Sequence, residues 1–211
     1  MGKRTLLSSI FLIFPGLLLA QPVAPEELYP LGEGTTWKFK TSDGRTIVQK
    51  VTREEKINDY PGMLLETSEG GKILATEHLG ISSDGIYRFT LNGNKLDRGL
   101  IVLKKNLKSG DTWTVDGVLE TGPVSGKVSV KEEEVAVPLG KFKTFAVKAE
   151  YADKDGKKHF VTSYYALGKG MVRQSFELAN KSTFSLELLE YTPGKKSAAP
   201  LPAGGESKKL P

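Results

Sequence analysis

Hydrophobic and polar residues alternate along most of the chain between residues 29 and 191. In the stretch TWKFKT, Trp37 and Phe39 fall on one face of an extended strand and two lysines fall on the other. The turn dipeptide Asp43-Gly44 follows, and a second alternating stretch begins at Thr46. Alternation on both sides of Asp-Gly predicts a β-hairpin.

The same pattern recurs to the end of the domain. Further turns are predicted at Gly70-Gly71, Asp84-Gly85, Asn92-Gly93 and Asp155-Gly156. No convincing stretch of helical period interrupts the strands. The chain is therefore predicted to be all-β, with about ten to twelve antiparallel strands in a curved sheet, a barrel or a sandwich.

Three pairs of segments recur in the same order. LGEGTTW at 31–37 matches LKSGDTW at 107–113, and VTREE at 51–55 matches VKEEE at 130–134. Residues 71–88 align without gaps on residues 156–173. This order predicts two similar halves, about 29–105 and 106–191. The alternative is that β proteins reuse the same turn chemistry.

The two ends of the chain differ from the middle. Lys3 and Arg4 precede an apolar run of about 15 residues, which is typical of a secretory signal peptide at 1–20 and short for a membrane span. An uncleaved N-terminal membrane anchor is the lesser alternative. Residues 192–211 are rich in Pro, Gly, Ala and Lys and are predicted to form a disordered basic tail. Residues 21–191 then form a single domain, exported to the periplasm or secreted.

The formal charge of +5 comes from the two ends. The signal segment supplies two of the 30 basic residues, and the tail supplies four of them and one of the 25 acidic residues, which leaves 24 of each sign in the domain. Nucleic-acid binding needs a concentrated positive field, so the sequence predicts none. The tail is best interpreted as a solvated linker, with weak contact to anionic surfaces as the alternative.

Side chains that commonly carry catalysis are sparse. The chain has no cysteine, and its histidines, His78 and His159, lack the spacing of a zinc site. No Gly-x-Ser-x-Gly motif is present. Neighbouring glutamates in the acidic runs at 54–55 and 132–134 cannot form the carboxylate pair of a glycoside hydrolase, because adjacent strand residues point to opposite faces. These runs are predicted to lie on a solvated edge or at a bulge. DKDG at 153–156 fails the calcium-loop pattern and is predicted to be a hairpin turn. We therefore predict no catalytic residue, no metal, no cofactor and no enzymatic activity.

Three aromatic residues are candidates for ligand contact: Trp37, Trp113 and Tyr165. A tryptophan after a glycine turn, on the apolar side of a strand, is more often part of the core, and we favour that interpretation for both tryptophans. Tyr164 and Tyr165 are adjacent, so one should face inward and the other outward.

The stretch SYYALGKGMVR at 163–173 superficially suggests a phosphate loop. The dinucleotide pattern requires a third glycine where Arg173 stands, and a helix after it. We predict a turn in which Gly170, and its repeat counterpart Gly85, adopt positive φ.

Three motifs also resemble a known family. Leu-x-x-Gly-x-x-Trp, then Val-Pro-x-Gly-x-Phe (VPLGKF at 137–142), then Tyr-x-x-x-Gly occur in the order typical of bacterial exported β proteins labelled as domains of unknown function. The resemblance spans residues 29–191 and implies a curved antiparallel sheet with no catalytic residues. The chain departs from the family pattern at Leu139, where a small residue is usual, and at Leu-Gly-Lys-Gly, where Gly-Val-Gly is common.

These observations favour a non-catalytic envelope protein. The leading hypothesis is an interaction or scaffold module that recognises an envelope protein or a surface. The alternative is a carrier of an apolar ligand such as a lipid, held inside a curved sheet or barrel. A hydrolase is the least favoured class.

Overall fold

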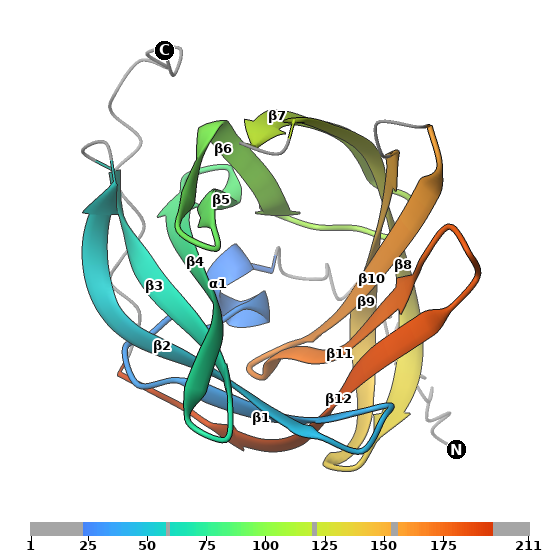
Figure 1. Ribbon diagram of the computed structural model, residues 1–211. Coiled ribbons are helices and arrows are strands. Elements are labelled where there is room, and N and C mark those ends of the chain that lie inside the picture. Colours follow the sequence, from blue (N-terminus) through green and yellow to red (C-terminus); the bar gives the residue numbers. More distant parts are fainter. Residues whose placement is uncertain (1–22, 58–59, 120–121, 153–155, 196–211) are drawn as a thin grey trace, which may run out of the picture.

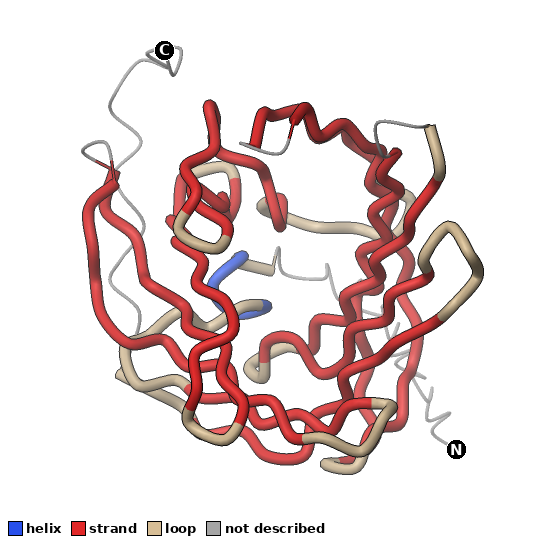
Figure 2. Tube along the Cα trace, in the orientation of Figure 1, coloured by secondary structure: helices blue, strands red, loops and turns tan. Residues whose placement is uncertain are grey.

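The computed structural model describes residues 23–57, 60–119, 122–152 and 156–195. In this part of the chain, twelve antiparallel strands form a single sheet that curls into a nearly closed barrel (Figures 1 and 2). The predicted all-β class and antiparallel curvature are confirmed. A sandwich is excluded, because all twelve strands belong to one continuous sheet.

The elements are, in chain order, α1 (Pro25–Leu28), β1 (Thr36–Thr41), β2 (Thr46–Ile57), β3 (Tyr60–Glu69), β4 (Lys72–Ser82), β5 (Gly85–Leu91), β6 (Asn94–Lys104), β7 (Thr112–Leu119), β8 (Gly122–Val137), β9 (Gly140–Ala152), β10 (Lys158–Ala166), β11 (Gly170–Glu177) and β12 (Thr183–Thr192).

The strands form two meanders joined at the chain ends. The order across the sheet is β6-β5-β4-β3-β2-β1-β12-β11-β10-β9-β8-β7, so the first strand pairs with the last. The meander β1–β6 lies within residues 29–105, and the meander β7–β12 lies within residues 106–191 except for the last residue of β12, Thr192. That the halves arose as a repeat stays a prediction.

The barrel closes at a seam between β6 and β7, which face each other in Figure 1 without a hydrogen-bonded ladder between them in the described residues. The Trp113 indole Nε1 donates to the Ile101 carbonyl at 3.4 Å. The Lys104 ammonium lies 5.2 Å from the centre of the Trp113 ring. Side chains rather than backbone pairing therefore hold this seam.

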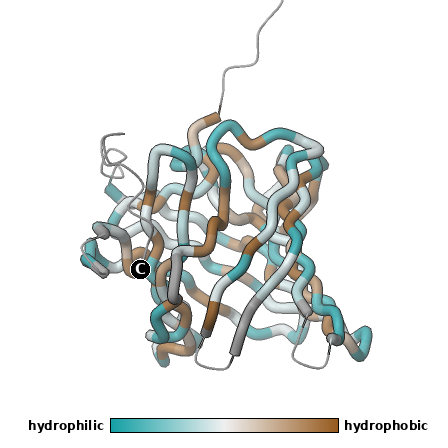
Figure 3. Tube along the Cα trace, turned by 90° about the horizontal axis from the view of Figure 1, so that it is seen from above, coloured by the Kyte–Doolittle hydropathy of each residue, from teal (hydrophilic) through white to brown (hydrophobic). Residues whose placement is uncertain are grey.

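The core fills the inside of the barrel. Hydrophobic and hydrophilic positions are interspersed along the strands (Figure 3), and the buried hydrophobic residues form one cluster. The one-turn helix α1 lies within the barrel (Figure 1), and Leu28, Tyr29 and Leu31 at its end are buried. One helical turn is too short to produce a periodic pattern, so the sequence did not predict it.

The folded region extends slightly beyond its predicted end. The Gly194 amide donates to the Thr35 hydroxyl at 3.1 Å, and the Lys195 amide donates to the Glu33 carbonyl at 2.8 Å. Residues 192–195, predicted as the start of the tail, therefore belong to the fold. The predicted signal peptide (1–20) and the remaining tail (196–211) lie outside the described residues. Among the described helices, none is long and apolar enough to cross a membrane.

Candidate functional site

Trp37 is the centre of the core beside α1. Its side chain is fully buried, with ring centres 5.4 Å from Tyr29 and 6.1 Å from Tyr191. The indole Nε1 donates to the Lys169 carbonyl at 2.6 Å. These contacts agree with the interpretation of Trp37 as a core residue.

The stretch at 163–173 forms the turn between β10 and β11. Gly168 and Gly170 have φ of 68° and 81°, which favours glycine. A Cβ on Gly170 would lie 2.8 Å from the Trp37 Nε1 atom. The Gly168 amide donates to the Glu27 carbonyl of α1 at 2.7 Å. The turn therefore covers Trp37 and holds α1, and the prediction of a turn with positive φ at Gly170 is confirmed.

The corresponding prediction for Gly85 is wrong, because Gly85 does not have positive φ. It is tightly packed instead: a Cβ there would lie 2.2 Å from the Leu103 carbonyl oxygen. Glycine is therefore required at 170 because of its positive φ, and at 85 because a side chain would clash with the Leu103 carbonyl.

The other two candidate aromatics are also buried. Trp113, 8% exposed, lies at the β6–β7 seam. Tyr165, 4% exposed, has its ring centre 5.5 Å from that of Tyr29, inside the barrel. Tyr164 points to the opposite face, where the Arg173 guanidinium lies 5.7 Å from its ring centre. Of the three candidates, Tyr165 also lines a cavity beside α1.

A cavity of about 450 Å³ opens beside α1, between the β10–β11 turn and the β8–β9 hairpin. We call it the mouth cavity. Its less polar walls are formed by Val23, Leu28, Phe145, Tyr165 and Leu167, and its polar part by Glu132, Glu133, Glu134, Lys143 and Thr144. Leu167 at the tip of the turn is 60% exposed.

The glutamates of the mouth cavity lie on an open edge of β8. Strand β7 pairs with β8 only as far as Ser129, whereas β9 pairs with β8 from Gly126 to Val137. Glu132, Glu133 and Glu134 are exposed. Of the two predicted arrangements, a solvated edge or a bulge, this run forms a solvated edge. Glu132, Glu134 and Lys143 give the cavity a charged rim, whereas the Glu133 side chain contacts the phenol of the outward-facing Tyr164.

An ion pair lies deeper in the barrel. The Arg88 Nε donates to the Glu77 carboxylate at 2.6 Å. Burial opposes the charge on Arg88, but the Glu77 carboxylate and its hydrogen bond outweigh burial and raise the pKa of Arg88. Although protein surrounds this pair, 27% of the Arg88 side chain and 16% of the Glu77 side chain remain accessible. We call it the interior ion pair.

Three phenols lie within the electrostatic reach of the interior ion pair: those of Tyr29, Tyr151 and Tyr165. Burial raises the pKa of all three, and that of Tyr165 reaches about 12. Each phenol therefore stays neutral over the physiological range. This cluster cannot be predicted from the sequence pattern, because its members are far apart along the chain.

Tyr165 gives a testable alkaline behaviour. An unfolded tyrosine ionises near pH 10.0, whereas folded Tyr165 does so at about 12. The difference in pKa therefore adds its full contribution to the free energy of unfolding below pH 10.0, and this contribution is lost as the pH rises toward 12. We expect Tyr165→Phe to weaken the fall in unfolding free energy across this window, with tyrosinate absorbance reporting the ionisation. An unchanged alkaline slope in the variant would contradict this assignment.

The two histidines lie on different strands, His78 in β4 and His159 in β10. His78 is buried, its Nε2 lies 2.7 Å from the Glu55 carbonyl, and burial lowers its pKa. No cluster of metal-ligating side chains occurs among the described residues. The absence of enzymatic activity stays a prediction, and most of the DKDG segment (153–155) lies outside the described residues.

The fold and its cavities define a class: a twelve-stranded barrel closed by a side-chain seam, with a short helix inside it. No protein-family model matches the chain, and no curated protein matches it. The family resemblance suggested by the motifs therefore stays a prediction.

Two solved structures are similar to it. One is a predicted lipoprotein from Parabacteroides distasonis ATCC 8503, with 15% identity, a TM-score of 0.48 and coverage of 78% of this chain and 98% of that one. The other is a predicted exported protein with a YmcC-like fold from Bacteroides fragilis NCTC 9343, with 16% identity, a TM-score of 0.47 and coverage of 81% and 100%. At these identities the similarity concerns the fold alone.

Proposed function

We propose that the protein binds an apolar ligand, such as a lipid chain, in the mouth cavity. The observation that carries the proposal is the volume of about 450 Å³ together with walls that are mainly apolar. Cavities of roughly 300–1,000 Å³ with apolar walls and a few polar groups are typical of small-molecule sites.

The position of Leu167 supports an apolar occupant. The side chain sits at the tip of the β10–β11 turn and is 60% exposed, beside the buried side chains of Leu28 and Tyr165. Backbone and indole hydrogen bonds to α1 and Trp37 hold this turn in place. A ligand chain in the cavity would remove Leu167 from water, at a gain of about 25 cal/mol for each Å² covered.

The rim selects the head group. Two glutamates, Glu132 and Glu134, and a single lysine, Lys143, line the same side of the cavity. An anionic head group would be repelled by this excess of carboxylates, while a neutral or cationic one would not. The ligand is therefore an apolar molecule without negative charge.

Of the two hypotheses drawn from the sequence, the cavity favours the carrier. The interaction or scaffold module remains a prediction, and so does export to the envelope. Both are compatible with a protein that binds an apolar ligand outside the cytoplasm.

The test is binding of three long-chain molecules by calorimetry: monoolein, oleylamine and oleate. We expect monoolein and oleylamine to bind and oleate to bind at least about tenfold more weakly, which corresponds to about 1.4 kcal/mol. Leu167→Glu should weaken monoolein binding by about tenfold or more, since burying the leucine is worth about 1.5–3 kcal/mol.

Leu178→Glu is the matched control, because Leu178 is also exposed, at 47%, but does not line the mouth cavity. Its affinity for monoolein should equal that of the unchanged protein. Equal binding by the Leu167→Glu variant, or a preference for oleate, would refute the proposal.

A further inference from the structure

A row of hydroxyl side chains crosses the second half of the barrel. Register places Thr112 opposite Ser129, Ser129 opposite Lys148, and Lys148 opposite Thr162. The row continues from Thr162 to Ser175 and then to Ser185. Six neighbouring strands, β7 to β12, thus contribute five hydroxyls and one ammonium at the same level. We call this set the hydroxyl row.

The hydroxyl row faces away from the core. The next level on the same strands contains Val147, Ser163, Gln174 and Leu186, which are paired with one another and belong to the inner face. Successive residues of a strand point to opposite faces of a sheet. The hydroxyl row therefore lies on the face opposite to Val147 and Leu186, both of which are buried.

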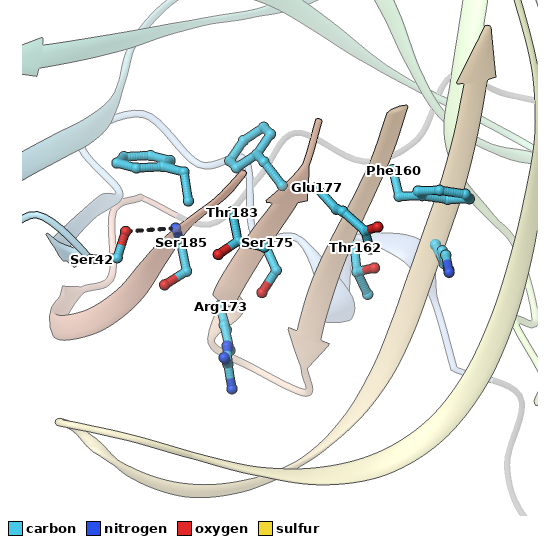
Figure 4. Close-up of a pocket in the computed structure, with 11 residues that line it drawn as sticks. Ser42, Phe160, Thr162, Arg173, Ser175, Glu177, Thr183 and Ser185 are labelled. Atoms are coloured by element: carbon cyan, nitrogen blue, oxygen red, sulfur yellow. Dashed lines mark hydrogen bonds between the residues drawn. The ribbon is translucent and has the colours of Figure 1, made fainter. Parts of the chain in front are cut away.

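This face is hollowed. A groove of about 330 Å³ includes four members of the row, from Lys148 to Ser185, together with Ser42, Phe160, Phe176, Phe184, Arg173, Glu177 and Thr183. Figure 4 shows Thr162, Ser175 and Ser185 on three neighbouring strands with Arg173 beside them. Ser42 extends the row: its amide donates to the Ser185 carbonyl at 2.9 Å, and its hydroxyl accepts from the Ser185 amide at 3.2 Å. We call it the hydroxyl groove.

Two cations lie in the hydroxyl groove. The Lys148 ammonium lies 4.3 Å from the centre of the Phe160 ring. The Arg173 Nε lies 3.8 Å from the Glu187 carboxylate, and this buried nitrogen has no hydrogen-bond partner. The carboxylate of the groove, Glu177, is held by Lys181 at 2.9 Å. Arg173 thus lines the groove with a guanidinium side chain that is 35% exposed and paired with Glu187, while Glu177 is paired with Lys181.

We propose that the hydroxyl groove binds an acidic saccharide. Hydroxyl side chains both donate and accept hydrogen bonds, as sugar hydroxyls do, so Thr162, Ser175 and Ser185 match a polyhydroxylated chain. They repeat at the strand spacing of about 4.8 Å, which presents a regular series of bonding groups across the sheet. Arg173 supplies the planar guanidinium suited to a carboxylate. An anion without hydroxyl groups could not donate hydrogen bonds to the hydroxyl oxygens of the row.

The test uses the full protein without its predicted signal segment and measures binding by calorimetry and NMR chemical shifts. The probes are trigalacturonic acid, the neutral maltotriose and inorganic sulfate. We expect trigalacturonic acid to bind, with shifts confined to the groove, and the other two to bind at least about tenfold more weakly. Raising the salt concentration should lower the affinity for trigalacturonic acid, because salt screens the attraction between its carboxylates and a partly exposed cation.

Two variants locate the site. Arg173→Gln should reduce the affinity for trigalacturonic acid by about tenfold or more, since hydrogen bonds to charged groups are worth about 1.5–3 kcal/mol. The double substitution Thr162→Val and Ser175→Ala should reduce it by about fivefold or more, through loss of two neutral hydrogen bonds.

Thr112→Val is the matched control, because Thr112 belongs to the hydroxyl row but not to the groove. It should leave the affinity unchanged, and Leu167→Glu should do the same, since the mouth cavity is a separate site. The proposal is overturned if trigalacturonic acid does not bind, if maltotriose or sulfate binds equally well, or if Thr112→Val weakens binding as much as the groove variants do.

Discussion

Replacement of Trp37 by alanine is expected to destabilise the protein by about 3–5 kcal/mol, the range for large aromatic residues removed from a core. Trp37 has no exposed surface and contacts the rings of Tyr29 and Tyr191. Its indole also satisfies the Lys169 carbonyl, which fixes the β10–β11 turn over the core. Urea unfolding followed by circular dichroism measures the loss.

Two further variants separate packing from the hydrogen bond. Trp37→Phe keeps an aromatic ring but loses the bond to Lys169, so its cost should lie below that of alanine. Gly170→Ala should be destabilising as well, because the residue has φ of 81° and a Cβ would lie 2.8 Å from the Trp37 indole. A loss of less than about 1 kcal/mol for Trp37→Ala would place the tryptophan outside the set of core residues.

Removing one charge of the interior ion pair is expected to cost about 3 kcal/mol, the lower end of the range for a broken buried pair. Glu77→Gln leaves the Arg88 guanidinium without its carboxylate in the interior of the barrel. The lower end applies because 27% of the Arg88 side chain is accessible and screening reduces the penalty. The free energy of unfolding in urea, at neutral pH, measures this effect.

A double-mutant cycle is the control for the interior ion pair. The combination of Glu77→Gln with Arg88→Met removes both charges, and we expect it to recover most of the stability lost by Glu77→Gln alone. The physical reason is that an uncompensated charge costs more than the pair contributes. If the double variant is less stable than the single one by the full cost of Arg88→Met, the two residues act independently and the interpretation fails.

Much of the fold follows from local patterns. Alternation at Trp37 and Phe39 placed both side chains on the inner face, and the structure buries both. The glycine at 170 and the adjacent pair Tyr164 and Tyr165 behaved as expected from backbone sterics and the period of a strand. These features depend on residues close together in the chain, which is why one sequence suffices to predict them.

The two proposed sites were not visible in the sequence. The mouth cavity joins Val23, Leu28, Leu167 and residues of the β8–β9 hairpin, which only the curled sheet brings together. The hydroxyl row depends on the register of six strands, and register is set by pairing across the sheet rather than by any one segment. Of the sequence candidates, Tyr165 lines the mouth cavity, whereas Trp37 and Trp113 line neither site.

The sequence by itself determined the strands, their turns and which face of most strands is apolar. Only the tertiary structure decided how the sheet closes and on which of its faces each polar residue lies. The aligned arginines show why: Arg88 lies in the interior ion pair, while Arg173 lies in the hydroxyl groove on the opposite face. Register shifts interrupt the pairing between His78 and Leu79 and between Tyr164 and Tyr165. A shift of one residue reverses the face on which each following side chain lies. Residues that align between the two halves, such as these arginines, can therefore lie on opposite faces of the sheet.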